Sequence, residues 1–178
     1  MSDRETRKAN VVEALNKARS MELHAIHQYM NQHYNLDDMD YGELAANMKL
    51  IAIDEMRHCE MFAERIKELG GEPTSEVAGK VVKGQEVKAI YRSDSDSEDD
   101  TIFVYNELRN VCVDNGDILT AKLFETIIGE EQIHLNYFDN ISDHIETLGD
   151  TFLSKIAGTP SSTGGTTKGF AIAPAAAN

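Results

Sequence analysis

Apolar residues recur every three or four positions along four long stretches of the chain, a spacing typical of amphipathic helices. The pattern predicts helices over residues 5–34, 41–69, 97–114 and 117–148. Residues that favour turns separate these stretches, namely a polar loop at 35–40, glycines at 70 and 71, a turn at 115–117 and a glycine at 149. The pattern therefore predicts an all-α fold with four long helices.

The connection between the second and third predicted helices is long. It covers roughly 25 polar residues, and in helix bundles such a connection crosses the bundle lengthwise, whereas short loops join antiparallel neighbours. This organisation predicts a ferritin-like four-helix bundle with up-down-down-up topology. The acidic run from Ser93 to Asp100 is expected to begin the third helix, where its side chains would cap the first turn.

The end of the chain differs in composition from the rest. Residues 150–157 suit a short fifth C-terminal helix, too small to fold alone. From residue 158 onward Gly, Ser, Thr, Ala and Pro dominate, and Lys168 is the only charged residue. We therefore expect one domain over 1–157 and a flexible tail over 158–178.

One pattern of acidic residues and histidines occurs twice. In each case a lone Glu is followed 33 residues later by a Glu that opens a Glu-x-x-His pair. The first set is Glu22, Glu55 and His58, and the second is Glu98, Glu131 and His134. Four carboxylates and two imidazoles are a suitable ligand set for two hard first-row metal ions that share bridging carboxylates.

The helical register of the two pairs favours a metal site over coincidence. Ile51 and Phe62 flank the first pair on its apolar stripe, and Ile127 and Phe138 flank the second. Residues three positions apart share a helix face, so each pair points into the core. Buried carboxylates cost several kcal/mol unless a metal, a partner or a proton compensates them. The alternatives are accidental spacing of a common residue and purely structural ion pairs.

Other acidic and imidazole side chains near the pattern do not match it. Glu107 lies off the apolar stripe, and Glu130 is turned about 100° from its neighbour at 131. Both are expected to face solvent or to support the ligands from outside. Four histidines have no matching partner and are expected to be surface or capping residues: His24, His27, His33 and His144.

The composition of the chain disfavours several classes of protein, namely nucleic-acid-binding, membrane-spanning and secreted proteins. The 178 residues carry a net charge of −14, which disfavours nucleic-acid binding and suits a protein that attracts cations. No apolar run is long enough to span a membrane, and the charged start of the sequence does not resemble a secretory signal. The two cysteines form no Cys-x-x-Cys motif, so a cytoplasmic location is expected.

These features together resemble the bacterioferritin family over about residues 1–157. The resemblance is carried by the matching positions already named and by the blocks at 21–29 and 53–58. It implies a hollow homo-oligomeric shell of 24 chains that stores an iron mineral. It also implies that the six repeated Glu and His residues bind iron as a ferroxidase centre within each bundle, with Glu55 and Glu131 as bridges.

The resemblance assigns a second cofactor to Met56. In bacterioferritins the matching Met ligates the iron of a haem, or a related porphyrin, at a two-fold interface, with one Met from each chain. Residues alone would favour an interface-packing Met, because this side chain fills irregular gaps. The family's inner-surface iron site is only partly matched, since Asp54 is present but Leu50 stands where some members have His.

The sequence therefore predicts iron storage with oxidation of Fe(II) to Fe(III) by dioxygen or hydrogen peroxide. A ferredoxin-like redox partner is expected for iron release, and Tyr29 and Tyr137 are candidate electron donors, although core packing also explains them. One alternative is a rubrerythrin-like peroxide reductase, which would need a Cys-x-x-Cys module. Another is a catalytically silent haem-binding shell.

Overall fold

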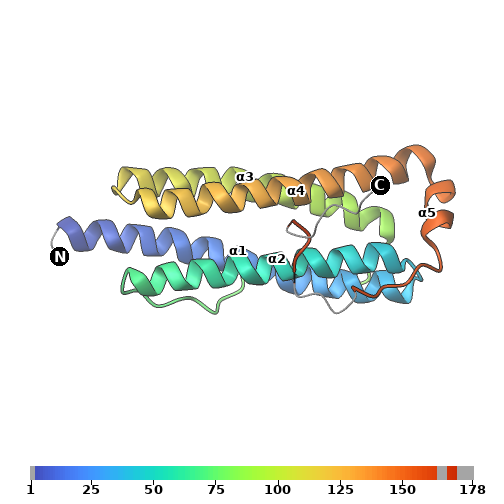
Figure 1. The fold of residues 1–178 in the computed structure, drawn as a ribbon, viewed down its shortest axis with the longest axis horizontal. Coiled ribbons are helices and arrows are strands. Elements are labelled where there is room, and N and C mark those ends of the chain that lie inside the picture. The colour runs from blue at the N-terminus through green and yellow to red at the C-terminus, as the bar shows by residue number, and fades with distance from the viewer. Residues whose placement is uncertain (1–2, 164–167, 172–178) are drawn as a thin grey trace.

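The computed structural model describes residues 3–163 and 168–171, which form five helices (Figure 1). The helices are α1 (Asp3–Asp38), α2 (Gly42–Glu68), α3 (Val87–Asp114), α4 (Ile118–Leu148) and α5 (Asp150–Ile156). The described part of the chain contains an isolated β-bridge between Tyr41 and Thr159 but no strand. None of the described helices is both long enough and apolar enough to cross a bilayer. The predicted all-α fold with a short fifth helix is confirmed.

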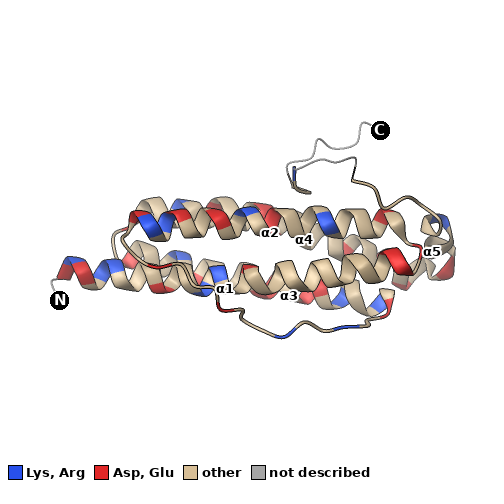
Figure 2. Ribbon diagram, turned by 90° about the horizontal axis from the view of Figure 1, so that it is seen from below, with Lys and Arg blue, Asp and Glu red and all other residues tan. Residues whose placement is uncertain are grey.

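The long helices form two antiparallel pairs, α1 with α2 and α3 with α4 (Figure 1). The connection at 69–86 runs along the bundle, so that α3 starts at the opposite end from the end of α2. In Figure 2, α2 and α4 form one layer and α1 and α3 the other, with this connection crossing the α1/α3 side. The up-down-down-up topology predicted from loop lengths is therefore correct.

Two predicted helix boundaries are wrong. α3 begins at Val87 rather than 97, and the acidic run lies within its first turns instead of opening it. Ile90 and Tyr91 are completely buried, so apolar burial extends the helix beyond the point where charge suggested a start. α1 likewise continues to Asp38 rather than 34, because Leu36 is completely buried.

Two apolar clusters fill the bundle on either side of its middle. One surrounds Tyr91 and Phe138, and the other surrounds Phe62, Tyr105 and Phe124. In the second cluster the ring of Phe62 lies 5.2 Å from that of Phe124 and meets Tyr105 edge-on at 5.8 Å. Between the clusters, buried residues of all four long helices are polar, and this layer holds the candidate site.

The chain after α5 returns to the start of α2. The backbone N–H of Gly158 donates to the carbonyl of Asp40 at 2.8 Å, and the N–H of Glu43 donates to Oγ1 of Thr159 at 2.8 Å. Thr159 thus caps the first turn of α2 from a distant part of the sequence. The domain boundary at 157 stays a prediction, and parts of the predicted flexible tail, 164–167 and 172–178, lie outside the described residues.

A polar cluster fixes the start of α4. The carboxylate of Asp117 accepts from the N–H of Thr120 at 3.0 Å, and both of its oxygens lie 2.9 Å from Nη2 of Arg65 on α2. Nε of Arg65 also donates to Oγ1 of Thr120 at 2.8 Å. One carboxylate therefore caps a helix and joins the two halves of the bundle.

Asp117→Ala should lower the free energy of unfolding by about 1–3 kcal/mol, because it removes the cap and leaves Arg65 without its partner. Asp117→Asn, which keeps an oxygen for the cap but loses the charge, should have a smaller effect. Thermal unfolding of the metal-free protein measures both. Equal Tm values for wild type and Asp117→Ala would contradict this role.

Candidate metal centre

The polar layer in the middle of the bundle contains six side chains that could bind metal. Each of the four long helices contributes, and every member is no more than 3% exposed. α1 supplies Glu22, α2 supplies Glu55 and His58, α3 supplies Glu98, and α4 supplies Glu131 and His134. The structure therefore brings together all six residues that the repeated sequence pattern singled out.

The ligand atoms form two overlapping groups. In each group one atom from every member lies within 4.8 Å of the others. The first group is Glu22, Glu55, His58 and Glu131, and the second is Glu55, Glu98, Glu131 and His134. Glu55 and Glu131 belong to both groups, so their two oxygens are placed to bridge a pair of ions, while each remaining residue serves one ion.

The imidazoles point their Nδ1 atoms at the shared carboxylates. Nδ1 of His58 lies 2.9 Å from Oε2 of Glu55 and 3.0 Å from Oε1 of Glu131. Nδ1 of His134 lies 3.0 Å from Oε2 of Glu131 and 3.2 Å from Oε1 of Glu55. Each histidine thus faces both bridging candidates, as ligands on opposite sides of a two-ion site would.

The far nitrogen of each imidazole meets a second carboxylate. Nε2 of His58 lies 3.1 Å from Oε2 of Glu130, and Nε2 of His134 lies 3.2 Å from Oδ2 of Asp54. Nη1 of Arg57 donates to Oδ1 of Asp54 at 2.8 Å and lies 3.6 Å from Glu130. Such outer carboxylates orient a ligating histidine and raise its basicity.

Two buried tyrosines hold the carboxylates of α1 and α3. The hydroxyl of Tyr29 on α1 donates to Glu98 on α3, and that of Tyr105 on α3 donates to Glu22 on α1. Because each bond crosses between helices, it fixes the separation of α1 and α3 as well as the orientation of the carboxylate. Tyr137 does not reach the cluster, and its hydroxyl accepts a bond from Asn47 at 3.2 Å.

Burial perturbs the acid–base properties of the cluster. Desolvation, aided by repulsion from Glu131 and Glu55, raises the pKa of both Glu22 and Glu98 well above the ordinary value. Burial would also raise the pKa of Glu131, but attraction to His58 outweighs it and lowers that pKa. Crowded carboxylates in a dry interior need a positive charge near them.

The donor set fits a pair of metal ions. Oε1 of Glu55 and Oε1 of Glu131 are buried and accept no hydrogen bond from the described residues, and each faces the Nδ1 atom of a histidine, at 3.2 and 3.0 Å. Buried oxygens are otherwise almost always hydrogen-bonded, so these two oxygens of the shared carboxylates, together with the facing imidazole nitrogens, are available to bind cations. Mixed carboxylate and imidazole ligands suit iron, manganese and zinc.

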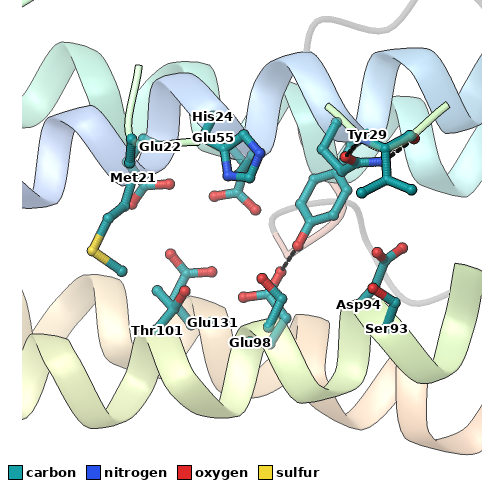
Figure 3. Close-up of a pocket in the computed structure, with 15 residues that line it drawn as sticks. Met21, Glu22, His24, Tyr29, Glu55, Ser93, Asp94, Glu98, Thr101 and Glu131 are labelled. Atoms are coloured by element: carbon teal, nitrogen blue, oxygen red, sulfur yellow. Dashed lines mark hydrogen bonds between the residues drawn. The ribbon is translucent and has the colours of Figure 1, made fainter. Parts of the chain in front are cut away.

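A cavity of about 180 Å³ adjoins the cluster between α1 and α3 (Figure 3). Glu22, Glu55, Glu98 and Glu131 form its inner wall, and Ala78 and Val82 of the 69–86 connection line its outer part. Figure 3 shows the four carboxylates directed into this space, with His24 facing it from α1. The cavity therefore brings open space up to the carboxylates of the cluster.

Asp94 is a further buried carboxylate in the wall of this cavity. It is 2% exposed, and its Oδ1 accepts from Nε2 of Gln32 at 2.9 Å. Its Oδ2 has no partner among the described residues, and neither has Oε1 of Gln32. Burial raises the pKa of Asp94 to about 7. Asp94 was not predicted to be buried, because it lies in the acidic run that was expected to cap the start of the third helix.

The side chains left out of the predicted site lie outside the cluster. Glu107 is exposed to solvent. Glu130 lies outside the cluster and supports His58, and both positions agree with what was expected of these two residues. The expectation of a surface or capping position is wrong for His33, which is buried and contacts the carbonyl of Ala45 at 2.8 Å through Nδ1.

The sequence analysis missed the supporting roles of three residues, Tyr105, Asp54 and Arg57. A signal was present, because the two halves of the site are related by a shift of 76 positions along the chain. The same shift pairs Tyr29 with Tyr105 and Asp54 with Glu130. Extending the repeat beyond the ligands would have predicted both tyrosines and both outer carboxylates.

Six buried carboxylate and imidazole ligands inside a bundle with a long crossover define the class of ferritin-like di-metal proteins. The family model described as "Ferritin-like domain" matches residues 12–148. The chain is 70% identical to the bacterioferritin of Desulfovibrio desulfuricans over 98% of both chains, and 33% identical to that of Streptomyces coelicolor over 82% of this chain and 88% of the other. The chain belongs to the bacterioferritin family.

Solved structures agree with this assignment. A crystal structure of the Desulfovibrio desulfuricans bacterioferritin, described as showing its diiron site in different catalytic states, superimposes with a TM-score of 0.91, covering 96% of this chain and 99% of the other at 70% identity. A Mycobacterium tuberculosis bacterioferritin gives 0.78 at 28% identity, over 83% and 93% of the two chains.

The raised pKa of Asp94 makes stability depend on pH. The unfolded carboxyl titrates near 4, so this group makes folding less favourable as the pH rises from about 4 to about 7. Asp94→Asn stays neutral, so its free energy of unfolding at pH 8 should exceed that of wild type by at most about 4 kcal/mol, with a smaller difference at pH 5.

Calorimetry of the metal-free protein at the two pH values measures this effect. Asp100→Asn, which changes an exposed carboxylate on the same helix, is the matched control and should change neither Tm. A difference between Asp94→Asn and wild type that does not vary with pH would show that Asp94 is not held at a raised pKa.

Proposed function

We propose that this protein stores iron and that each chain is a ferroxidase, oxidising Fe(II) to Fe(III) at the six-ligand cluster. The observation that carries the proposal is the pair of overlapping ligand groups that share Glu55 and Glu131. Membership of the bacterioferritin family supports iron as the metal, and the diiron site of the Desulfovibrio desulfuricans relative supports two ions per chain.

Iron is the substrate of this reaction. Oxidation of two bound Fe(II) to Fe(III) supplies two electrons to dioxygen or hydrogen peroxide. Glu55 and Glu131 bridge the two positions, His58 and Glu22 complete one, and His134 and Glu98 complete the other. The anionic ligands favour the more highly charged Fe(III), because Coulomb attraction in a dry interior grows with ionic charge.

The surrounding residues keep this geometry before iron arrives. The tyrosine hydroxyls orient the carboxylates of α1 and α3, and the outer carboxylates hold the imidazoles. Apolar clusters pack on both sides of this layer and hold the helices in place. The ligands therefore need little rearrangement when they bind ions. The net charge of −14 raises the local concentration of Fe(II) around the molecule.

Iron storage requires an enclosed space, and large exposed apolar side chains on the single chain favour its assembly into a shell. Tyr34, Phe103 and Leu119 are 63%, 67% and 69% exposed, which is unfavourable for large apolar side chains unless other copies cover them. A homo-oligomeric shell accounts for this exposure. Membership of the family supports a shell of 24 chains and a ferredoxin-like partner for iron release.

Met56 fits a role at an interface between two chains. It lies on α2 next to the ligand Glu55, but its side chain is 45% exposed and turned away from the cluster. An exposed thioether is available to a haem or related iron porphyrin, and a two-fold axis would bring a second Met56 to its opposite face. The porphyrin would supply a route for electrons through the shell.

Replacing a bridging carboxylate tests the ferroxidase proposal. Glu131→Ala should slow the fast phase of aerobic Fe(II) oxidation by roughly 100-fold or more, since both ions lose a ligand. Stopped-flow absorbance of the metal-free shell, titrated with Fe(II), measures this phase, which should saturate in wild type at about two irons per chain.

Glu107→Ala is the matched control for that experiment, because it removes an exposed carboxylate from the same bundle. It should oxidise Fe(II) at the wild-type rate, and both variants should assemble normally. Unchanged oxidation in Glu131→Ala would remove this residue from the reaction. Bound iron without any fast phase in wild type would indicate a silent storage shell.

Replacing Met56 tests the porphyrin site separately. Met56→Leu should abolish the visible absorption of bound iron porphyrin, because leucine keeps the volume but has no sulfur to coordinate iron. Fe(II) oxidation should continue, since the two sites use different faces of α2. Met61→Leu, a thioether substitution on the same helix, should retain the porphyrin, and porphyrin binding by Met56→Leu would contradict the assignment.

A further inference from the structure

Residues 168–171 lie against α2 and α4, next to the metal cluster and on the opposite side from the cavity. The N–H of Phe170 donates to the carbonyl of Leu50 at 3.2 Å, and the N–H of Ala171 donates to Oδ2 of Asp54 at 2.8 Å. This segment is part of the stretch expected to form a flexible tail. Figure 2 shows the short described segment 168–171 on the α2/α4 side of the bundle, whereas the 69–86 connection covers the α1/α3 side.

The segment packs so closely against Asp54 that position 169 must be a glycine. A Cβ added to Gly169 would lie 1.6 Å from Oδ1 and 2.2 Å from Cγ of Asp54. Asp54 has little room to move aside, because Arg57 and His134 also hold its carboxylate. No residue with a side chain fits at this position while the segment stays where it is.

The ring of Phe170 extends the cover toward the cluster itself. Its centroid lies 6.4 Å from that of His134 and 4.8 Å from that of Tyr137. The segment therefore contacts both a metal-ligand candidate and the carboxylate that orients it. Asp54 is completely buried, although it lies on the side of the bundle that the segment covers.

Within the part of the chain that the structure describes, no comparable segment covers the equivalent position in the other half of the site. His58 is oriented by Glu130, which the internal repeat pairs with Asp54, but the side chain of Glu130 is 19% exposed. Among the described residues, the only ring contact recorded for His58 is with His134. The two halves of the cluster are alike in their ligands and differ in what lies outside them.

We propose that residues 168–171 close the His134 half of the centre, so that the two metal positions exchange ions at different rates. The position at His134 retains its ion, and the position at His58 exchanges with solvent past Glu130. Phe170 and Ala171 are positioning residues, since they act through His134 and Asp54. This inference rests on the proposed di-metal function and adds a direction to ion movement through the site.

The two rates should differ because an ion can leave only when the side chains that bind it move away. A bound ion leaves when its histidine and carboxylates swing away one at a time and water takes their places. At His134 that motion is opposed by a fixed Asp54 and a packed ring, so His134 cannot swing away from the ion until the segment moves. At His58 the partly exposed Glu130 can turn toward solvent and carry an ion with it.

Co(II) provides a probe that dioxygen does not readily oxidise. The metal-free full-length protein is titrated with Co(II), and excess EDTA is then added while the visible absorbance of the bound ion is followed. Wild type should bind about two Co(II) per chain and release them in two phases. Gly169→Ala should accelerate the slow phase by roughly 10-fold and leave the fast phase unchanged, since loss of outer support has effects of this size.

Two further variants make the result specific. Gly129→Ala makes the same chemical change on α4 at a position where the added Cβ meets no atom within 4 Å, and both of its phases should equal those of wild type. Phe170→Ala introduces no clash and should also accelerate only the slow phase. His134→Ala should lose the slow phase, which assigns that phase to the covered position.

Two results would overturn the inference, and a third would overturn the proposed function on which it rests. Release rates in Gly169→Ala equal to wild type would show that the segment does not control exchange. Equal acceleration of both phases would show general loosening rather than closure of one half. Binding of fewer than two Co(II) per chain by wild type would instead contradict the di-metal centre, and stoichiometry therefore separates failure of this inference from failure of the proposed function.

Discussion

The burial of four carboxylates and two imidazoles in the middle of a helix bundle is the constraint on which the rest of the structure depends. Removing such groups from water is costly, and the crowded carboxylates repel one another, as the raised pKa values of Glu22 and Glu98 indicate. Apolar clusters on both sides supply stability that this layer lacks. The tyrosine hydroxyls and outer carboxylates hold the ligands in place, and two cations complete the balance of charge.

The site is built twice from the same parts. The shift of 76 positions relates ligands, tyrosines and outer carboxylates, so the α1–α2 and α3–α4 pairs present matching faces to the centre. The contacts of the tyrosines and outer carboxylates with the ligands cross from one pair to the other, as Tyr29 does to Glu98 and Asp54 does to His134. The metal layer therefore joins the two halves of the bundle as well as binding ions.

Differences between the two sides of the bundle give this symmetric centre a direction. The cavity between α1 and α3 reaches the carboxylates of both halves, whereas among the described residues the α2/α4 side is covered, by 168–171, in the His134 half alone. The two metal positions therefore have equivalent ligands but unequal surroundings. Such inequality would give a direction to ions that move through the centre.

The helices, their topology and the six candidate ligands could be predicted from local spacing, namely 3.6 residues per turn, loop length, and i, i+3 placement. The groups that support those ligands could not, because they come from segments that meet only in the folded chain. Asp54 and Tyr105 act on residues of other helices, and Asp94 is buried within an acidic run that looks exposed in the sequence. The start of α3 and the position of 168–171 likewise depend on packing between distant segments, which local periodicity does not contain.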